Sequence, residues 1–129
     1  MPLSQITPEE LSRRLEAKED FVILDVRMPI EWESIHIEGA VHKPLHHLGE
    51  AIATLPKDKR ISCICAHGNR SQRAASILHA AGFNAENVYG GMAAFVQHEF
   101  QSGKITEEQY VERIDKVENP AWPDAQKPA

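Results

Sequence analysis

The chain has 129 residues, of which 42% are hydrophobic, and this suits one compact domain with its own core. The formal net charge is −5, and basic residues cluster only in short pairs such as Arg13 and Arg14. We therefore expect no binding to nucleic acids or to acidic membranes. The N-terminal sequence lacks the basic and apolar segments of a secretory leader, and no apolar stretch approaches membrane-spanning length, so we expect a cytoplasmic location.

The first half of the chain alternates helix and strand signals. Residues 7–10, Thr-Pro-Glu-Glu, form a helix start with a capping-box pattern. The apolar run at residues 21–24 is typical of a strand buried on both faces of a parallel sheet. A further short strand is predicted over residues 41–45, and an amphipathic helix over residues 46–55.

The second half continues this alternation. Residues 61–65 predict a strand, and apolar positions recur at helical spacing over residues 71–81 before Gly82. Residues 83–89 predict the last strand. The alternation indicates an α/β fold with a central, mostly parallel sheet of about five strands flanked by helices on both faces.

The segment from Ile61 to Ser71 changes character at its second cysteine, Cys65. A cysteine that ends a buried strand and precedes a tight loop and a helix N-terminus faces converging N–H groups and the positive end of the helix dipole. That field favours the thiolate, and Arg70 adds a permanent positive charge. The same arrangement binds a small oxyanion. The neighbouring Cys63 is predicted to turn into the core and to have a packing role, and no disulfide between the two is expected.

The pattern Cys65-x-x-Gly68-x-Arg70 resembles the active-site loop of the rhodanese family, and most of all its single-domain, thiosulfate-using members. Two further segments are similar to family signatures. One is Asp25-x-Arg27 followed by Glu31 and by residues 36–40, with Ile35 where a glycine is usual; the other is Gly90-Gly91 opening a helix, with Phe95 in place of the usual tryptophan. We expect Asp25, Arg27 and Glu31 to form a structural cluster that ties a strand end to the next helix.

The resemblance implies a sulfurtransferase. Cys65 would be the nucleophile that carries a sulfane sulfur as a persulfide, and the loop would hold a small anionic sulfur donor. The implied acceptor is cyanide, a small thiol or a protein. His67 would either attract the anionic donor or face solvent. By position, the loop residues are Ala66, His67, Gly68, Asn69 and Arg70.

Two rival functions share this fold and are weighed against the sulfurtransferase. A cysteine phosphatase or arsenate reductase uses a loop one residue longer, whose arginine would fall at Ser71. A non-catalytic rhodanese-like binding or regulatory module often lacks the loop cysteine, which is present here. No cofactor is expected, and no metal site either, because Cys63, Cys65 and His67 lack a second ligand pair.

The predicted domain covers residues 1–103. Residues 104–129 are expected to form a C-terminal helix, capped near Thr106, and an irregular tail from Glu118 onward. The oligomeric state stays open.

Overall fold

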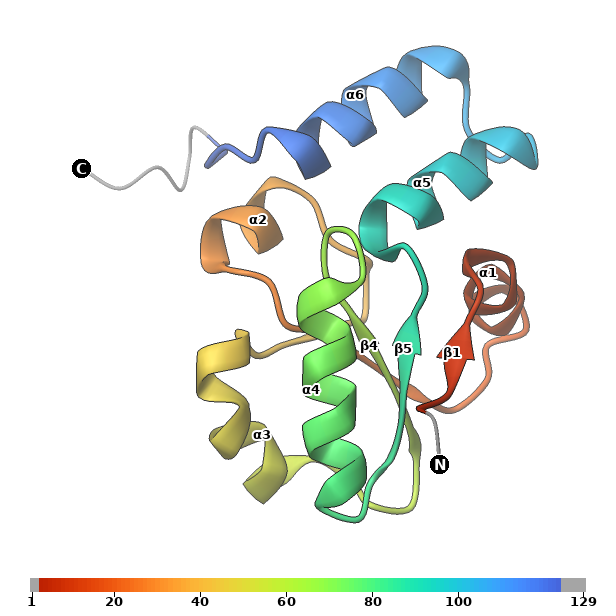
Figure 1. Ribbon diagram of the computed structural model, residues 1–129. Coiled ribbons are helices and arrows are strands. Elements are labelled where there is room, and N and C mark those ends of the chain that lie inside the picture. The colour runs from red at the N-terminus through yellow and green to blue at the C-terminus, as the bar shows by residue number, and fades with distance from the viewer. Residues whose placement is uncertain (1–2, 124–129) are drawn as a thin grey trace.

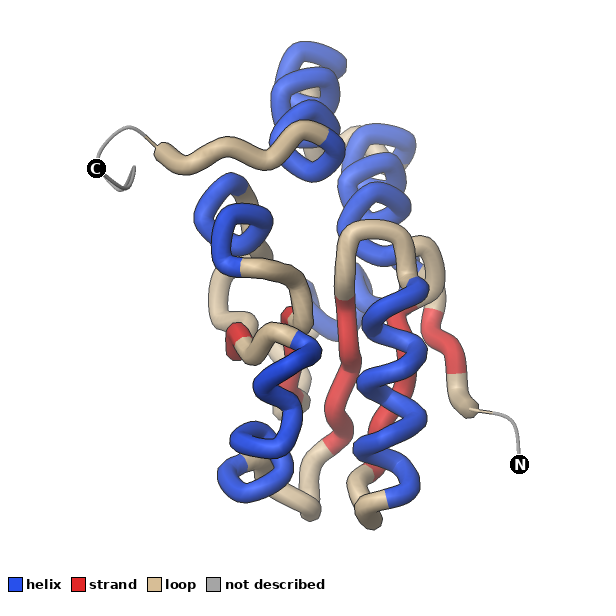
Figure 2. Tube along the Cα trace, turned by 60° about the vertical axis from the view of Figure 1, so that its left-hand side comes forward, coloured by secondary structure: helices blue, strands red, loops and turns tan. Residues whose placement is uncertain are grey.

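The computed structural model describes residues 3–123 and contains a five-stranded sheet of order β1-β5-β4-β2-β3. All neighbouring strands are parallel, as Figures 1 and 2 allow the reader to follow. The α/β class and the parallel sheet predicted from the sequence are confirmed. The strands are β1 (Gln5–Ile6), β2 (Val22–Asp25), β3 (Val41–His42), β4 (Arg60–Ile64) and β5 (Asn84–Val88).

Helices cover both faces of the sheet. Leu24 and Cys63 pack with residues of α3 and α4 on one face, whereas Ile23 and Ile64 pack with residues of α1 and α5 on the other. This alternation along β2 and β4 explains why each strand reads as a continuous apolar run. The helices are α1 (Pro8–Glu16), α2 (Pro29–Ser34), the 3-10 turn η1 (Leu45–His47), α3 (Leu48–Thr54), α4 (Asn69–Ala80), α5 (Gly91–Gln101) and α6 (Glu107–Glu118).

Two details differ from the sequence prediction. The strand predicted over residues 41–45 ends at His42, and residues 45–47 form a 3-10 turn before α3 begins. The N–H groups of Lys43 and Leu45 still donate to the carbonyls of Asp25 and Val26, so the chain stays beside the end of β2 until the 3-10 turn. The two-residue edge strand β1 was not predicted, because so short a segment carries no periodicity and forms only by pairing with β5.

The C-terminal helix α6 packs on α5, and the rings of Phe100 and Tyr110 stack with their centroids 4.8 Å apart. Residues 119–123 have no regular secondary structure, and residues 124–129 of the expected tail lie outside the described residues. The domain boundary at residue 103 stays a prediction. Within residues 3–123, every helix is too short or too polar to cross a membrane.

Candidate active site

Cys65 lies directly after β4, where the chain leaves the sheet and turns into α4. It is 1% exposed. Its Sγ atom accepts hydrogen bonds from the backbone N–H groups of Gly68, at 3.1 Å, and Ser71, at 3.3 Å. Gly68 precedes α4 with a φ of +101°, in the left-handed region that glycine adopts readily. The loop and the first turn of α4 therefore direct amide hydrogens at one sulfur atom, which stabilises negative charge there.

The N-terminus of α5 holds the other side of the loop. The N–H of Met92 donates to the carbonyl of Cys65 at 2.8 Å, and the N–H of Ala93 donates to the carbonyl of Ala66 at 3.0 Å. This approach requires a glycine at position 91, because a Cβ on Gly91 would lie 2.4 Å from the carbonyl oxygen of Cys65. Gly91 at the start of α5 therefore allows α5 to hold the backbone of the Cys65 loop in place.

Two buried polar residues lie behind Cys65. The Ser71 hydroxyl oxygen is 3.2 Å from Cys65 Sγ and 2.6 Å from Asn87 Oδ1. The Asn87 amide nitrogen donates to the carbonyl of Gly68 and to Gln5 Oε1. Because a backbone carbonyl can only accept, the Asn87 oxygen faces Ser71 and takes its single hydroxyl proton. With its proton directed at Asn87, the Ser71 oxygen can accept a hydrogen bond from Cys65 in its thiol form. To donate to the Cys65 thiolate, the Ser71 hydroxyl must rotate away from Asn87.

Sequence reasoning gave this hydrogen-bonded group no role in the site. The position of Ser71 directly after Arg70 is a signal that could have found it. Gln5 and Asn87 are 82 positions apart in the sequence and come together only because β1 pairs with β5. No local sequence pattern predicts the contact between Gln5 and Asn87.

Arg70 ends the loop, and its guanidinium is bound to a carboxylate of another element. Its Nη1 and Nη2 atoms lie 2.6 and 2.8 Å from the two carboxylate oxygens of Glu31, in α2. The Glu31 hydrogen bond raises the pKa of Arg70 against the opposing effect of burial, and the charges of Cys65 and Asp25 raise it further. Burial opposes ionisation of Glu31, but hydrogen bonds from Arg70 and the Met28 backbone lower its pKa overall. Both groups are therefore ionised near neutral pH.

Asp25 and Arg27 form a separate, fully buried ion pair. The Arg27 Nη2 atom donates to Asp25 Oδ2 at 2.8 Å and to the carbonyl of Ile35 at 2.6 Å. The pair ties the end of β2 to the end of α2, as expected from the sequence. Glu31, which was grouped with this pair, instead makes its side-chain ion pair with Arg70.

The remaining loop residues differ in exposure. Ala66 is buried and Asn69 is exposed. The His67 side chain is 56% exposed, and its Nε2 atom lies 2.6 Å from Oε1 of Glu118, at the end of α6. His67 therefore meets a carboxylate from the C-terminal helix, a contact that the sequence did not predict.

Cys63 is buried in the core between the sheet and helices α3 and α4. Burial raises its pKa to about 12, and the nearby charges of Glu86 and Cys65 contribute to the increase. A thiol in this state is a packing group, in agreement with the role predicted from strand alternation.

A parallel five-stranded sheet with a cysteine held in a short loop at the carboxyl end of its central strand defines the rhodanese-like class of domain. The family model described as "Rhodanese-like domain" matches residues 7–98, and the chain belongs to this family.

Named relatives agree with this assignment. Over 80 residues the chain is 38% identical to the thiosulfate sulfurtransferase GlpE of Pseudomonas syringae, covering 62% of this chain and 74% of GlpE. Over 97 residues it is 38% identical to MoeZ of Mycobacterium tuberculosis, named as an adenylyltransferase/sulfurtransferase, covering 73% of this chain. The match spans only 25% of MoeZ. These names support sulfurtransferase activity as the general class.

A solved structure has the same fold. The crystal structure of a rhodanese-like domain protein from Staphylococcus aureus superposes with a TM-score of 0.69 and 31% sequence identity, covering 72% of this chain and 91% of that one.

Proposed function

We propose that this protein takes a sulfane sulfur from a small anionic donor, with thiosulfate as the first candidate, and carries it as a persulfide on Cys65. The observation that carries the proposal is the convergence of two N–H groups, from Gly68 and Ser71, on the Cys65 sulfur. Hydrogen bonds from fixed backbone groups stabilise an anionic sulfur without reorganisation during the reaction. The name of the GlpE relative supports thiosulfate as the first donor to test.

In the first step, the Cys65 thiolate attacks the outer sulfur of thiosulfate. A new S–S bond forms to Cys65, the original S–S bond of thiosulfate breaks, and its electron pair leaves on sulfite. The product is a Cys65 persulfide anion, so the charge of −3 on the reactants, roughly counted as one thiolate and one dianion, is conserved. Arg70 is the last residue of the loop, and the charge of Cys65 helps to raise its pKa. Its guanidinium is placed to offset the negative charge of the donor.

In the second step, a nucleophile such as cyanide attacks the outer persulfide sulfur. The bond between that sulfur and Cys65 Sγ breaks, thiocyanate leaves, and the electron pair returns to Cys65 as a thiolate. A thiol acceptor follows the same course and leaves as a persulfide. Neither step needs a general base once the thiolate has formed.

The loop length favours sulfur chemistry over phosphatase chemistry. Arg70 is the fifth residue after Cys65, whereas the longer loop of a cysteine phosphatase or arsenate reductase would need its arginine at position 71, which is Ser71. Ser71 is also fully buried and committed to Asn87 and Cys65. The binding-module alternative predicts no covalent adduct at all.

Intact-mass spectrometry of the reduced protein, before and after thiosulfate, tests the proposal. We expect a gain of one sulfur atom that cyanide removes and that is absent in Cys65→Ser. Cys63→Ala serves as the matched control and keeps the gain. No adduct with either thiosulfate or a low-molecular-weight persulfide would overturn the proposal and favour the binding module.

A further inference from the structure

The C-terminal helix α6 lies outside the residues matched by the family model, which end at residue 98. In both backbone views it passes above the loop between β4 and α4, from the end of α5 toward α2 (Figures 1 and 2). The loop between β4 and α4 therefore faces a helix outside the residues that match the family model.

Three consecutive residues at the end of α6 contact three different parts of the domain. The carbonyl of Lys116 accepts a hydrogen bond from the Ser34 hydroxyl of α2 at 3.0 Å. Val117 is 2% exposed and joins the core beside α5. The Glu118 carboxylate reaches His67 in the catalytic loop at 2.6 Å. The end of α6 thus joins the two sides of the active-site mouth, α2 and the loop.

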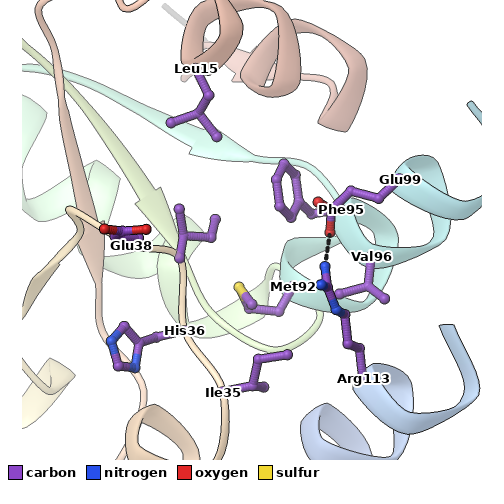
Figure 3. Close-up of a pocket in the computed structure, with 10 residues that line it drawn as sticks. Leu15, Ile35, His36, Glu38, Met92, Phe95, Val96, Glu99 and Arg113 are labelled. Atoms are coloured by element: carbon purple, nitrogen blue, oxygen red, sulfur yellow. Dashed lines mark ion pairs between the residues drawn. The ribbon is translucent and has the colours of Figure 1, made fainter. Parts of the chain in front are cut away.

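The middle of α6 packs on α5 and the core through Tyr110 and Ile114. Arg113 reaches Glu99 of α5 at 3.6 Å, across a pocket of about 530 Å³ (Figure 3). Leu15, Met92 and Phe95 line the same pocket from the body of the domain. The end of α6 adds its own polar contacts with α2 and with the loop, and losing these contacts would weaken the attachment of the segment above the loop.

We infer that α6 makes the active site selective for small sulfur acceptors and excludes thiols carried on a folded protein surface. The inference rests on the proposed persulfide chemistry. In the transfer step, an acceptor thiolate attacks the outer persulfide sulfur, the bond from that sulfur to Cys65 Sγ breaks, and the electron pair returns to Cys65. Cys65 itself is 1% exposed, so the acceptor must come to the loop.

The size of the acceptor decides whether it can reach the outer persulfide sulfur. Cyanide or glutathione can enter beside the Glu118 carboxylate, whereas a cysteine on a protein surface brings the surrounding backbone with it. That surface would have to occupy the space that residues 116–118 fill between α2 and His67. The covering segment therefore selects by steric exclusion rather than by a specific contact with the acceptor.

The test uses the full chain and two variants that remove polar contacts at the end of α6 and so weaken its attachment, Glu118→Ala and the double variant Ser34→Ala/Glu118→Ala. Glu108→Ala, at the exposed start of the same helix, is the matched control. Each protein is loaded from thiosulfate, and transfer is then measured to cyanide, to glutathione and to a ubiquitin variant with one surface cysteine. The double variant should raise transfer to the ubiquitin thiol about tenfold, the combined effect expected for loss of the His67–Glu118 contact and of one hydrogen bond. Transfer to cyanide should change less than about threefold, and the control should match the parent protein.

Equal transfer from the parent protein to glutathione and to the ubiquitin thiol would overturn the inference, as would unchanged ratios in the double variant. A separate readout keeps it distinct from the proposed function. Alkylation of Cys65 by iodoacetamide and by a polyethylene-glycol maleimide compares small and bulky reagents without any persulfide. Suppose that no persulfide forms, but that the alkylation rate with the bulky reagent rises relative to the rate with the small one in the double variant. The proposed function then fails, and the covering role of α6 stands.

Discussion

The guanidinium of Arg70 meets the carboxylate of Glu31 in a two-point contact, with N–O distances of 2.6 and 2.8 Å. A residue of α2 therefore decides where the arginine of the catalytic loop lies. This is a stronger constraint than the loop sequence alone conveys, because an unpaired arginine has many side-chain conformations.

Arg70→Ala should lower kcat/KM for thiosulfate about 100-fold, because a positive group beside the developing anion is lost. Arg70→Lys should recover part of this loss, since lysine keeps the charge but not the planar two-point contact with Glu31. Steady-state thiocyanate formation measures both. An uncharged organic trisulfide donor supplies the control: if Arg70→Ala slows its reaction as much as that of thiosulfate, Arg70 does not act through the donor charge.

Glu31→Gln should make stability less sensitive to acid. The pKa of Glu31 is lowered from its ordinary value of 4.5, so the folded state binds a proton less readily than the unfolded chain. The ion pair therefore stabilises the fold above that value and loses its effect as the pH falls through the lowered pKa. Because Arg70 is 37% exposed and partly screened by solvent, we expect a loss of only about 1 kcal/mol at pH 7. Urea unfolding at pH 7 and pH 3 measures it, and an equal difference at both values would contradict the assignment.

Cys63 should stay unmodified when Cys65 reacts. Burial raises the pKa of Cys63 to about 12, so at pH 8 almost no thiolate is present there. Iodoacetamide should add one group to the native protein and none to Cys65→Ser, as measured by mass spectrometry after peptide digestion. In Cys63→Ala, Cys65 should be alkylated at the same rate as in the parent protein. The variant should lose about 1 kcal/mol of unfolding free energy through the small cavity created. Rapid modification of Cys63 in the native protein would show that it is accessible.

Ser71→Ala should affect both stability and reactivity. It removes the donor to the buried Asn87 oxygen, and an unsatisfied buried acceptor costs about 1–3 kcal/mol of unfolding free energy. It also removes the hydroxyl that can rotate toward an anionic Cys65, so alkylation at pH 7 should slow about fivefold. Ser71→Thr keeps the hydroxyl and should restore the alkylation rate. A Ser71→Thr protein as slow as Ser71→Ala would assign the effect to packing.

Gly91→Ala should be the most damaging substitution at a glycine of the site. The added Cβ would meet the Cys65 carbonyl at 2.4 Å, and the backbone φ of +63° disfavours any side chain. We expect a loss of about 3 kcal/mol or more in unfolding free energy, together with loss of sulfur transfer. Gly103→Ala is the control, because its φ is also positive, at +80°, but its Cβ would meet nothing within 4 Å. It should cost about 1 kcal/mol. Equal losses of unfolding free energy in Gly91→Ala and Gly103→Ala would show that the positive φ, and not the contact with Cys65, causes the effect.

The sequence predicted the parts of the site that lie close together along the chain. Cys65, Gly68 and Arg70 occupy one loop, and the apolar runs on either side placed that loop at the end of a central strand. The ion pair between Arg70 and Glu31, 39 positions apart, was not predicted, although both residues had been singled out. Oppositely charged residues are common on any surface, so charge alone could not pair these two.

The contacts of Gln5 and Glu118 with the site depend on tertiary structure alone. Gln5 lies on a strand too short to show alternation, and Glu118 lies where the sequence placed the start of an irregular tail. Gln5 reaches Asn87 because β1 pairs with β5, and Glu118 reaches the loop because α6 packs on α5. Such contacts follow from the assembled fold and leave no mark in a local pattern.

The order of these contacts along the chain bears on how the protein is made. A chain emerges from the ribosome with its N-terminal end first, and domains can begin to fold before synthesis ends. Gln5, Ser71 and Asn87 are all available once β5 has emerged, whereas Glu118 follows 51 positions after His67. The hydrogen bonds around Cys65 can therefore form before the end of α6 lies above the loop. Of the residues around the Cys65 sulfur, those at the end of α6 are therefore synthesised last.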